Sequence, residues 1–237
     1  TADPERDEVA DFLNLLGPLL RKVRVPLLID TTNPNVVETA LKNIGGKPAI
    51  NSVNLEDGGA RLREMAQLAR QYGAALVCGM IDDDADAGMA ITVERKIEIA
   101  RKIHSILKNE FGCHETNIIL DALVFPAGSG DPQYKGAARE TVKALRRFKE
   151  IFPECPTILG ISNVSFGLPN AGRDIVNSVF LYECTKAGLD FAIVNTERLR
   201  RYATIPKKER KLAEDILFVG DDASLAAFNE YFSGIKV

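Results

Sequence analysis

The chain has 237 residues, of which 46% are hydrophobic and 27% are charged, which suits one large domain over residues 1–237 with a substantial core. Its formal net charge is -3 and its lysines and arginines are scattered, so the concentrated positive charge of a nucleic-acid-binding protein is missing and we expect no nucleic-acid partner. No apolar run reaches the ~20 residues that span a bilayer, so we expect no membrane association.

The cysteines and histidines indicate a reduced, cytoplasmic protein without a metal site. The four cysteines have no paired spacing, and His104 and His114 do not combine with them into a zinc-binding pattern. The cysteines are Cys78, Cys113, Cys155 and Cys184.

Helical and strand-like segments alternate from the start of the chain. Residues 9–16 carry apolar side chains at helical spacing, and the Gly-Pro pair at 17–18 predicts the end of that helix. An apolar run then ends at Asp30, and Asn33 and Pro34 predict the N-cap and the first residue of the next helix. Further strands are predicted at 48–51 and 74–80, with helices at 34–44 and 62–72.

The same alternation continues to the end of the chain. It implies a parallel sheet with right-handed crossovers, and the length is close to the roughly 250 residues typical of a (β/α)8 barrel. Only six strands are evident where a closed barrel has eight, so we expect an α/β fold of the TIM-barrel type with six β/α units. The later strands are predicted at 117–121, 157–162 and 191–195, and the later helices at 97–107, 142–148, 175–180 and around Leu212 and Leu225.

Carboxylates and carboxamides follow five of the six predicted strands. Because the carboxyl ends of parallel strands share one face of a barrel, we expect these side chains to converge. Carboxylates accept hydrogen bonds from ring N–H and amino groups, while carboxamides both donate and accept, so the set suits a neutral, amide-rich heterocycle such as a pterin. The alternative is that each residue only caps a helix or starts a turn. The residues are Asp30, Asn51, Asp121, Asn163 and Asn195.

Four motifs contain most of these residues: Leu28-Ile29-Asp30-Thr31-Thr32-Asn33, Ile50-Asn51-Ser52-Val53-Asn54, Ile119-Leu120-Asp121 and Gly160-Ile161-Ser162-Asn163-Val164-Ser165-Phe166. In order and spacing they resemble the pterin-binding methyltransferases. That family comprises the methyltetrahydrofolate:corrinoid protein methyltransferases and the folate-binding module of cobalamin-dependent methionine synthase. The resemblance runs from about Val25 to Asn195 and implies a (β/α)8 barrel.

Two strands of the family barrel precede the equivalent of Asp30, and this chain has only a predicted helix there. We therefore expect an open edge beside the strand that ends at Asp30. Whether the chain is a fragment that lacks the first two strands is left open.

The resemblance also implies a role for each motif residue. Asp30, Asn51 and Asp121 hydrogen-bond the edge of the pterin ring. Asn163 lies near N5, the atom that carries the methyl group, and Arg173 lies against the pterin. Asn195 corresponds to a strand end that varies among family members.

The implied reaction moves the N5 methyl group of methyltetrahydrofolate to the cobalt of cobalamin or another corrinoid, which is carried by a partner protein or domain. An amine leaves poorly unless its nitrogen is protonated or hydrogen-bonded as the bond breaks. We therefore expect Asn163 and Asp121 to be the catalytic residues, with Asn163 near N5 and Asp121 next to Asn163 on the side away from N5. The identity of the acceptor, the direction of transfer and the oligomeric state, including a homodimer, are left open.

Two alternative functions would also involve binding of a pterin. Dihydropteroate synthases usually show Ser-Arg-Lys at the seventh strand end and Arg-Val-His at the last, where this chain has Ser162-Asn163-Val164 and Asn195-Thr196. A non-catalytic folate-binding module would keep the same binding residues.

Two further features predict loops. The acidic segment 82–88 has Ala87 at the glycine position and Val93 at the last glutamate position of a calcium loop, which argues against calcium. Gly128-Ser129-Gly130 lacks the lysine of a nucleotide-binding loop, so we interpret this segment as a flexible loop.

Overall fold

The computed structural model describes residues 7–235. They contain six strands and eight α-helices, grouped into two compact units. The first unit comprises Thr1–Gly88 and Ala100–Ile119, and the second comprises Met89–Ile99 and Leu120–Val237.

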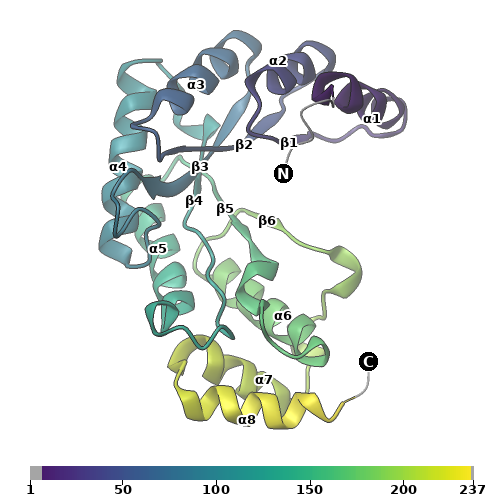
Figure 1. Cartoon of the computed structure of the whole chain (residues 1–237), viewed down its shortest axis with the longest axis vertical. Helices are drawn as coiled ribbons and strands as arrows, with labels where there is room; N and C mark the ends of the chain where they lie inside the picture. Colours follow the sequence, from purple (N-terminus) through teal and green to yellow (C-terminus); the bar gives the residue numbers. More distant parts are fainter. Residues whose placement is uncertain (1–6, 236–237) are drawn as a thin grey trace. The chain divides into compact units, whose positions relative to one another are not determined.

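The first unit holds three parallel strands, β1 (Leu28–Asp30), β2 (Ala49–Leu55) and β3 (Ala75–Asp82). Figure 1 shows α2 (Pro34–Asn43) and α3 (Ala60–Tyr72) side by side along these strands, with α1 (Glu8–Lys22) next to α2. Every residue of β3 except Ile81 is buried, as expected for a parallel strand that is covered on both faces.

Local sequence explains how these elements begin and end. Asn33 caps α2, because its Oδ1 accepts a hydrogen bond from Asn35 N at 3.0 Å, and Pro34 follows in the first turn, as predicted. Helix α3 ends at Gly73, whose φ of 71° lies in the left-handed region that favours glycine.

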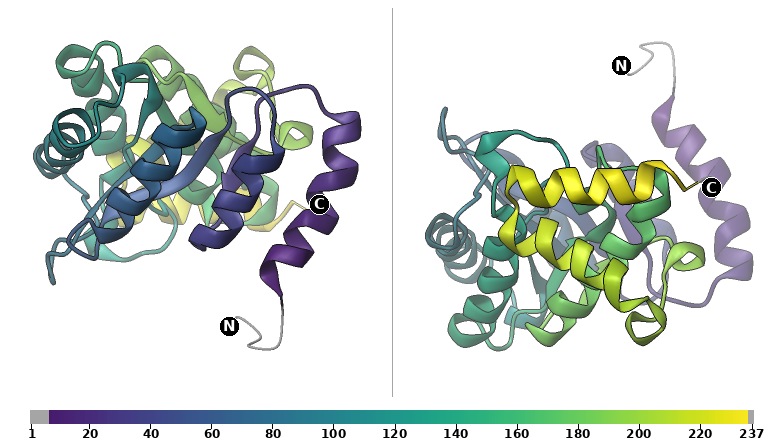
Figure 2. Two further views of the ribbon diagram at one scale, coloured as in Figure 1. Left: turned by 90° about the horizontal axis from the view of Figure 1, so that it is seen from above. Right: turned by 90° about the horizontal axis from the view of Figure 1, so that it is seen from below.

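The second unit holds the last two residues of β4 (Ile118–Asp121) and the parallel strands β5 (Thr157–Gly160) and β6 (Phe191–Ile193). Its helices include the first part of α4 (Val93–Asn109) together with α5 (Ala137–Ile151), α6 (Asn170–Lys186), α7 (Lys207–Glu214) and α8 (Asp222–Ser233). Figure 2 shows α7 and α8 side by side, and α8 also contacts α6. This contact is close, because a Cβ on Gly172 would lie 2.4 Å from Phe228.

The amino ends of β5 and β6 are joined by one carboxylate. Asp190 Oδ2 accepts hydrogen bonds from Thr157 N at 2.8 Å, from Thr157 Oγ1 at 3.1 Å and from Lys149 Nζ at 2.5 Å. Since Lys149 belongs to α5, this carboxylate connects two strands and a helix at the end of the strands opposite to Gly160.

Several predicted boundaries were wrong, including the end of β3, which lies at Asp82 and not at Met80, and the end of β6, which lies at Ile193 and not at Asn195. Helix α1, which Asp7 caps at its start and which packs against α2, continues through Pro18 to Lys22. Strand β2 continues past Asn51 to Leu55, because Val53 and Leu55 alternate into the core. Strand β5 stops at Gly160, and the following residues, Ile161–Ser165, form a 3-10 helix.

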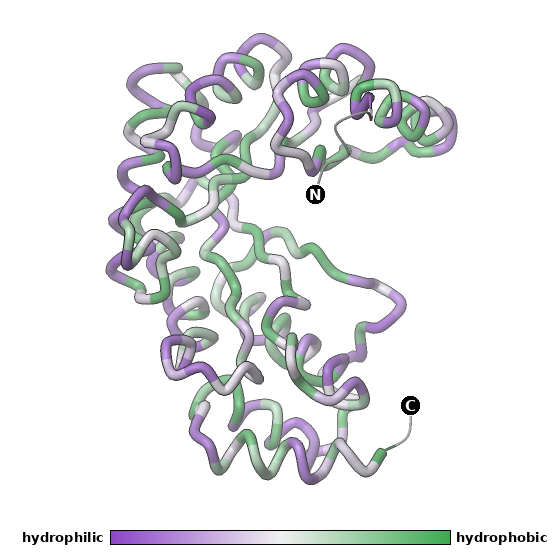
Figure 3. Tube along the Cα trace, in the orientation of Figure 1, coloured by the Kyte–Doolittle hydropathy of each residue, from purple (hydrophilic) through white to green (hydrophobic). Residues whose placement is uncertain are grey.

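The edge strands leave apolar residues exposed. Among residues 7–235, β1 pairs only with β2, and its Leu28 is 38% exposed; on the other edge strand, β6, Phe191 is 50% exposed. Figure 3 shows hydrophobic residues along β5 and β6 and polar residues in the loop that follows β6. None of the helices within residues 7–235 has the length and apolar character needed to cross a membrane.

Candidate functional site

In the first unit, the predicted residues Asp30 and Asn51 come together. They are register partners on the parallel strands β1 and β2, so their Cα atoms lie side by side. Asp30 is exposed and Asn51 is half-buried. The peptide bond between Asn51 and Ser52 is cis, and the pairing of β2 with β3 shifts register between Asn51 and Val53. The two strands thus present a carboxylate and a carboxamide at the same position along the strand direction.

In the second unit, Asp121 ends β4 and starts a tight turn. Its Oδ1 accepts a hydrogen bond from Leu123 N at 2.9 Å, and Leu123 has φ 62°, which is strained for a residue with a side chain. Burial raises the pKa of Asp121 to about 6, although the Leu123 N–H and the charge of Lys96 act to lower it. The carboxyl group can therefore change its protonation state near neutral pH.

Lys96 lies beside this turn, and the sequence analysis missed it. Its side chain is fully buried, and its Nζ donates to Ala90 O at 2.7 Å and to Ala122 O at 2.5 Å. Burial lowers the pKa of Lys96 to about 7, against the charges of Asp121 and Glu140, which raise it. One signal was available, since Lys96 precedes Ala100 by one helical turn and so falls on the apolar face of its helix.

Asn163 lies in the 3-10 helix after β5. It is exposed, and its carboxamide makes no hydrogen bond within the described part of the chain, so both of its polar atoms are available to a ligand. A Cβ built on Gly160 would lie 3.2 Å from Asn163 Nδ2. Glycine at 160 therefore makes room for the carboxamide.

Arg173 and Asn195 line one cavity of about 180 Å³ at the carboxyl ends of β5 and β6. Ser162, which precedes Asn163, also lines it. Arg173 Nε donates to Ser165 Oγ at 3.2 Å, and its guanidinium lies 5.3 Å from the centre of the Phe166 ring. Asn195 Oδ1 accepts from Glu197 N at 3.1 Å, so this residue also has the helix-capping role that the alternative interpretation gave it.

One residue of this cavity lining has a buried acceptor without a partner among the described residues. Asn177, on α6, lines it, and its buried Oδ1 has no hydrogen-bond partner among residues 7–235. A buried polar atom without a partner costs free energy unless a ligand or water satisfies it. The lining also includes Arg198 and Asp174, so the cavity suits a polar ligand.

The loops after β4 and β5 pack tightly on each other. Ala127 N donates to Val164 O at 2.9 Å, and a Cβ on Gly128 would lie 2.3 Å from Leu168. Gly167 has φ 82°, and a Cβ on it would lie 3.2 Å from Gly128 O. The glycines of the segment 128–130, interpreted from the sequence as flexibility, include one that is needed for close packing beside Asn163.

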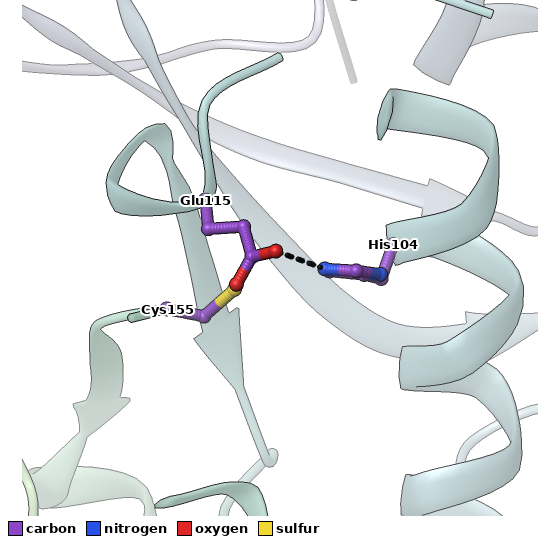
Figure 4. A group of neighbouring side chains, drawn as sticks. All are labelled: His104, Glu115 and Cys155. Atoms are coloured by element: carbon purple, nitrogen blue, oxygen red, sulfur yellow. Dashed lines mark ion pairs between the residues drawn. The ribbon is translucent and has the colours of Figure 1, made fainter. Parts of the chain in front are cut away.

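Other polar clusters belong to the scaffold. In the segment 82–88, Asp84 Oδ1 accepts from Asp86 N and Ala87 N, which makes a local turn. His104 Nε2 lies 3.5 Å from Glu115 Oε1 (Figure 4), and Lys108 Nζ donates to the same oxygen, which lowers the pKa of Glu115. Glu115 stands before β4, at the end of that strand opposite to Asp121.

Comparison with known proteins agrees with the polar lining of the cavity that contains Arg173 and Asn195. Residues 2–195 match the family described as pterin binding enzyme. The methionine synthase of Mycobacterium tuberculosis (strain ATCC 25618 / H37Rv) is 38% identical over 216 residues, and that of Mycobacterium leprae (strain TN) is 37% identical over the same length. Each match covers 90% of this chain, which spans only 18% of the length of these relatives.

Solved structures with the same fold include dihydropteroate synthases. The enzyme from Thermus thermophilus aligns with a TM-score of 0.58 at 24% identity, over 82% of this chain and 74% of its own. The enzyme from Vibrio fischeri aligns with a TM-score of 0.53 at 14% identity, over 95% and 77%. These likenesses concern the fold alone, and they confirm the predicted class, a TIM-barrel-type α/β fold with six strands among the described residues. The chain belongs to the family of pterin-binding enzymes.

Proposed function

We propose that this chain transfers the N5 methyl group of methyltetrahydrofolate to the cobalt of cobalamin or a related corrinoid held by a partner protein or domain. The observation that carries the proposal is the 38% identity to a methionine synthase over 90% of the chain, within the pterin-binding family. The likeness to dihydropteroate synthases does not favour the synthase reaction, because at 24% identity or less it concerns the fold alone.

The binding roles follow from the motif resemblance. Asp30 and Asn51 are proposed to bind the edge of the pterin ring, as is Asp121. Arg173 is proposed to lie against the ring and Asn195 to contact its rim. Two features support a polar ligand: the buried, unpaired Oδ1 of Asn177, a residue that lines the same cavity as Arg173 and Asn195, and the available carboxamide of Asn163.

The proposed chemistry breaks the methyl–N5 bond and forms a methyl–cobalt bond and an N5–H bond. The reduced corrinoid acceptor would supply the electron pair for the new bond to the methyl carbon, and the electron pair of the methyl–N5 bond stays on N5, which takes up a proton from solvent. Asn163 is proposed to hydrogen-bond N5 as this occurs. Asp121, whose pKa of about 6 allows it to hold or release a proton near neutral pH, assists it. The protein's contribution is to orient the folate and to stabilise the leaving nitrogen.

One spectroscopic experiment tests the proposal. The chain is mixed with methyltetrahydrofolate and free cob(I)alamin, and the visible spectrum is followed for methylcobalamin. We expect methylcobalamin to form with the wild type and with Asn43→Ala, an exposed asparagine on α2, and to form much more slowly with Asn163→Ala.

Two outcomes would contradict the proposal. Tight folate binding without methylcobalamin, even with corrinoid in excess, would favour the non-catalytic folate-binding module. Formation of dihydropteroate from a pterin pyrophosphate and p-aminobenzoate would favour the synthase. Because free cob(I)alamin is the acceptor in this assay, the natural corrinoid partner need not be known.

A further inference from the structure

Lys96 is an unusual residue in the second unit, because it is fully buried although lysine rarely is. It stands in the first turn of α4, where the helix dipole disfavours a positive charge. Its ammonium group donates to two backbone carbonyls, Ala90 O and Ala122 O, and lies 5.1 Å from the centre of the Phe125 ring. Burying a positive charge at this position costs free energy, and packing alone does not explain why the lysine is there.

The contact between the Lys96 ammonium group and Ala122 O explains why a lysine is buried here. The carbonyl of Ala122 and the N–H of Leu123 belong to one peptide group, and that N–H donates to Asp121 Oδ1 at 2.9 Å. This peptide group therefore has the Lys96 ammonium at its oxygen and the Asp121 carboxyl at its nitrogen. An ammonium at the oxygen polarises the peptide and makes its N–H a stronger donor.

The same contacts hold the peptide group in place. Leu123 has φ 62°, a conformation that leucine rarely adopts and that the surroundings must maintain. Lys96 holds the carbonyl before Leu123, and the hydroxyl of the buried Thr141 donates to Leu123 O at 2.9 Å. The turn that presents Asp121 is thus fixed on both sides.

We propose that Lys96 is the positioning residue of Asp121, acting through the Ala122–Leu123 peptide group to orient the carboxylate and to favour its ionised form. This inference deepens the proposed function and rests on it, because it takes Asp121 to be a hydrogen-bond acceptor for the pterin ring.

The charges around Lys96 define the pH range in which this arrangement operates. Asp121 on β4 and Glu140 on α5 face the ammonium and raise its pKa, while burial lowers it to about 7. Burial raises the pKa of Asp121 to about 6. Between these values both groups are charged. Above about pH 7 Lys96 loses its proton, so the support for the Asp121 carboxylate weakens.

The first test uses the wild-type protein and needs neither folate nor activity. The amide resonance of Leu123 is followed by ¹H–¹⁵N NMR from pH 5 to pH 8. Because this amide belongs to the peptide group between the two charges, we expect its chemical shift to change with the ionisation of Asp121 and again with that of Lys96. A resonance that stays constant over this range would overturn the proposal.

The second test removes the charge. In Lys96→Met, the pKa of Asp121, measured from its ¹³C carboxyl resonance, is expected to rise by about 1 unit, and the Kd for tetrahydrofolate at pH 7 to rise about 3- to 10-fold. Lys102→Met removes a half-exposed lysine from the same helix and is expected to change neither value. Lys96→Gln keeps a donor without the charge and replaces Lys96→Met if that variant does not fold.

The outcomes of these tests are distinguishable. An unshifted pKa of Asp121 in a folded Lys96 variant would overturn the positioning role. A wild type that does not bind tetrahydrofolate would instead contradict the proposed function, while the NMR titration would still report on the contact between Lys96 and Asp121.

Discussion

Asp30 and Asn51 are register partners on neighbouring parallel strands, so a carboxylate and a carboxamide stand side by side on β1 and β2. Paired residues at this spacing can bind the same edge of a planar ligand, with the carboxylate accepting hydrogen bonds and the amide both donating and accepting. Their effects on binding should therefore be coupled.

A double-mutant cycle tests this pair. Asp30→Ala and Asn51→Ala are each expected to weaken tetrahydrofolate binding by about 1–3 kcal/mol, because each leaves a polar group of the ligand unpaired. The double variant should lose less than the sum, because neighbouring residues act on one ligand edge. Isothermal titration calorimetry measures all four proteins. Full affinity in both single variants would remove Asp30 and Asn51 from the site.

Asn163→Ala tests the role of the carboxamide at N5. An interaction that strengthens only as the methyl–N5 bond breaks affects the rate more than the affinity. Turnover with cob(I)alamin is therefore expected to fall about 10- to 1000-fold, with a much smaller change in folate Kd. Equal losses in rate and affinity would make Asn163 an ordinary binding residue, and unchanged turnover would show that the family role does not apply.

Gly160→Ala displaces the same carboxamide without removing it. The new Cβ would lie 3.2 Å from Asn163 Nδ2, so the amide must move by a few tenths of an ångström. Because Asn163 is exposed, the free energy of unfolding should change by less than about 1 kcal/mol, while turnover falls about 3- to 30-fold because alignment at N5 is lost. Gly45→Ala is the matched control, since no atom lies within 4 Å of its Cβ. Equal turnover in the two variants would contradict this reasoning.

Asp121 predicts a pH dependence of stability. Its pKa is about 6 in the folded chain and near 3.8 when unperturbed, so between these values the folded state keeps a proton that the unfolded state has lost. Stability should therefore decrease as pH rises from about 4 to 6, by up to about 3 kcal/mol.

Urea denaturation of the wild type and of Asp121→Asn from about pH 4 to 6.5 measures this effect. The asparagine cannot ionise and can still accept the Leu123 N–H, so its unfolding free energy should lack this decrease and exceed that of the wild type at the upper end of the range. Identical pH profiles would show that the carboxyl group is not desolvated.

Much of the fold could be predicted from the sequence because the periodicities were clear. The apolar run of β3, the Asn33-Pro34 start of α2 and the alternation of strands and helices identified six strands and their helices. Boundaries were less reliable where tertiary contacts decide them. Helix α1, which packs against α2, continues past Pro18, and core packing of Val53 and Leu55 extends β2 past Asn51.

The sequence predicted site residues only from their places at expected strand ends. Asp30 and Asn51 are register partners although β2 continues past Asn51, and Arg173 and Asn195 line one cavity, while their binding roles stay predictions. Lys96 and Leu123 could not be found in this way. The burial of Lys96 depends on Ala90, Ala122 and Phe125, and the left-handed conformation of Leu123 has no signal in the identity of that residue.

The hydrogen bonds of Asp190 to Thr157 and Lys149 determine which parts of this molecule can be substituted without disturbing the sheet. They set the register of β5 and β6 at the amino ends of the strands, at the end opposite to Asn163 and Asn195. Substitutions in the loops after these strands can therefore alter ligand or acceptor preference while the strands keep their alignment. New specificities are best sought by varying those loops with Asp190, Thr157 and Lys149 held constant.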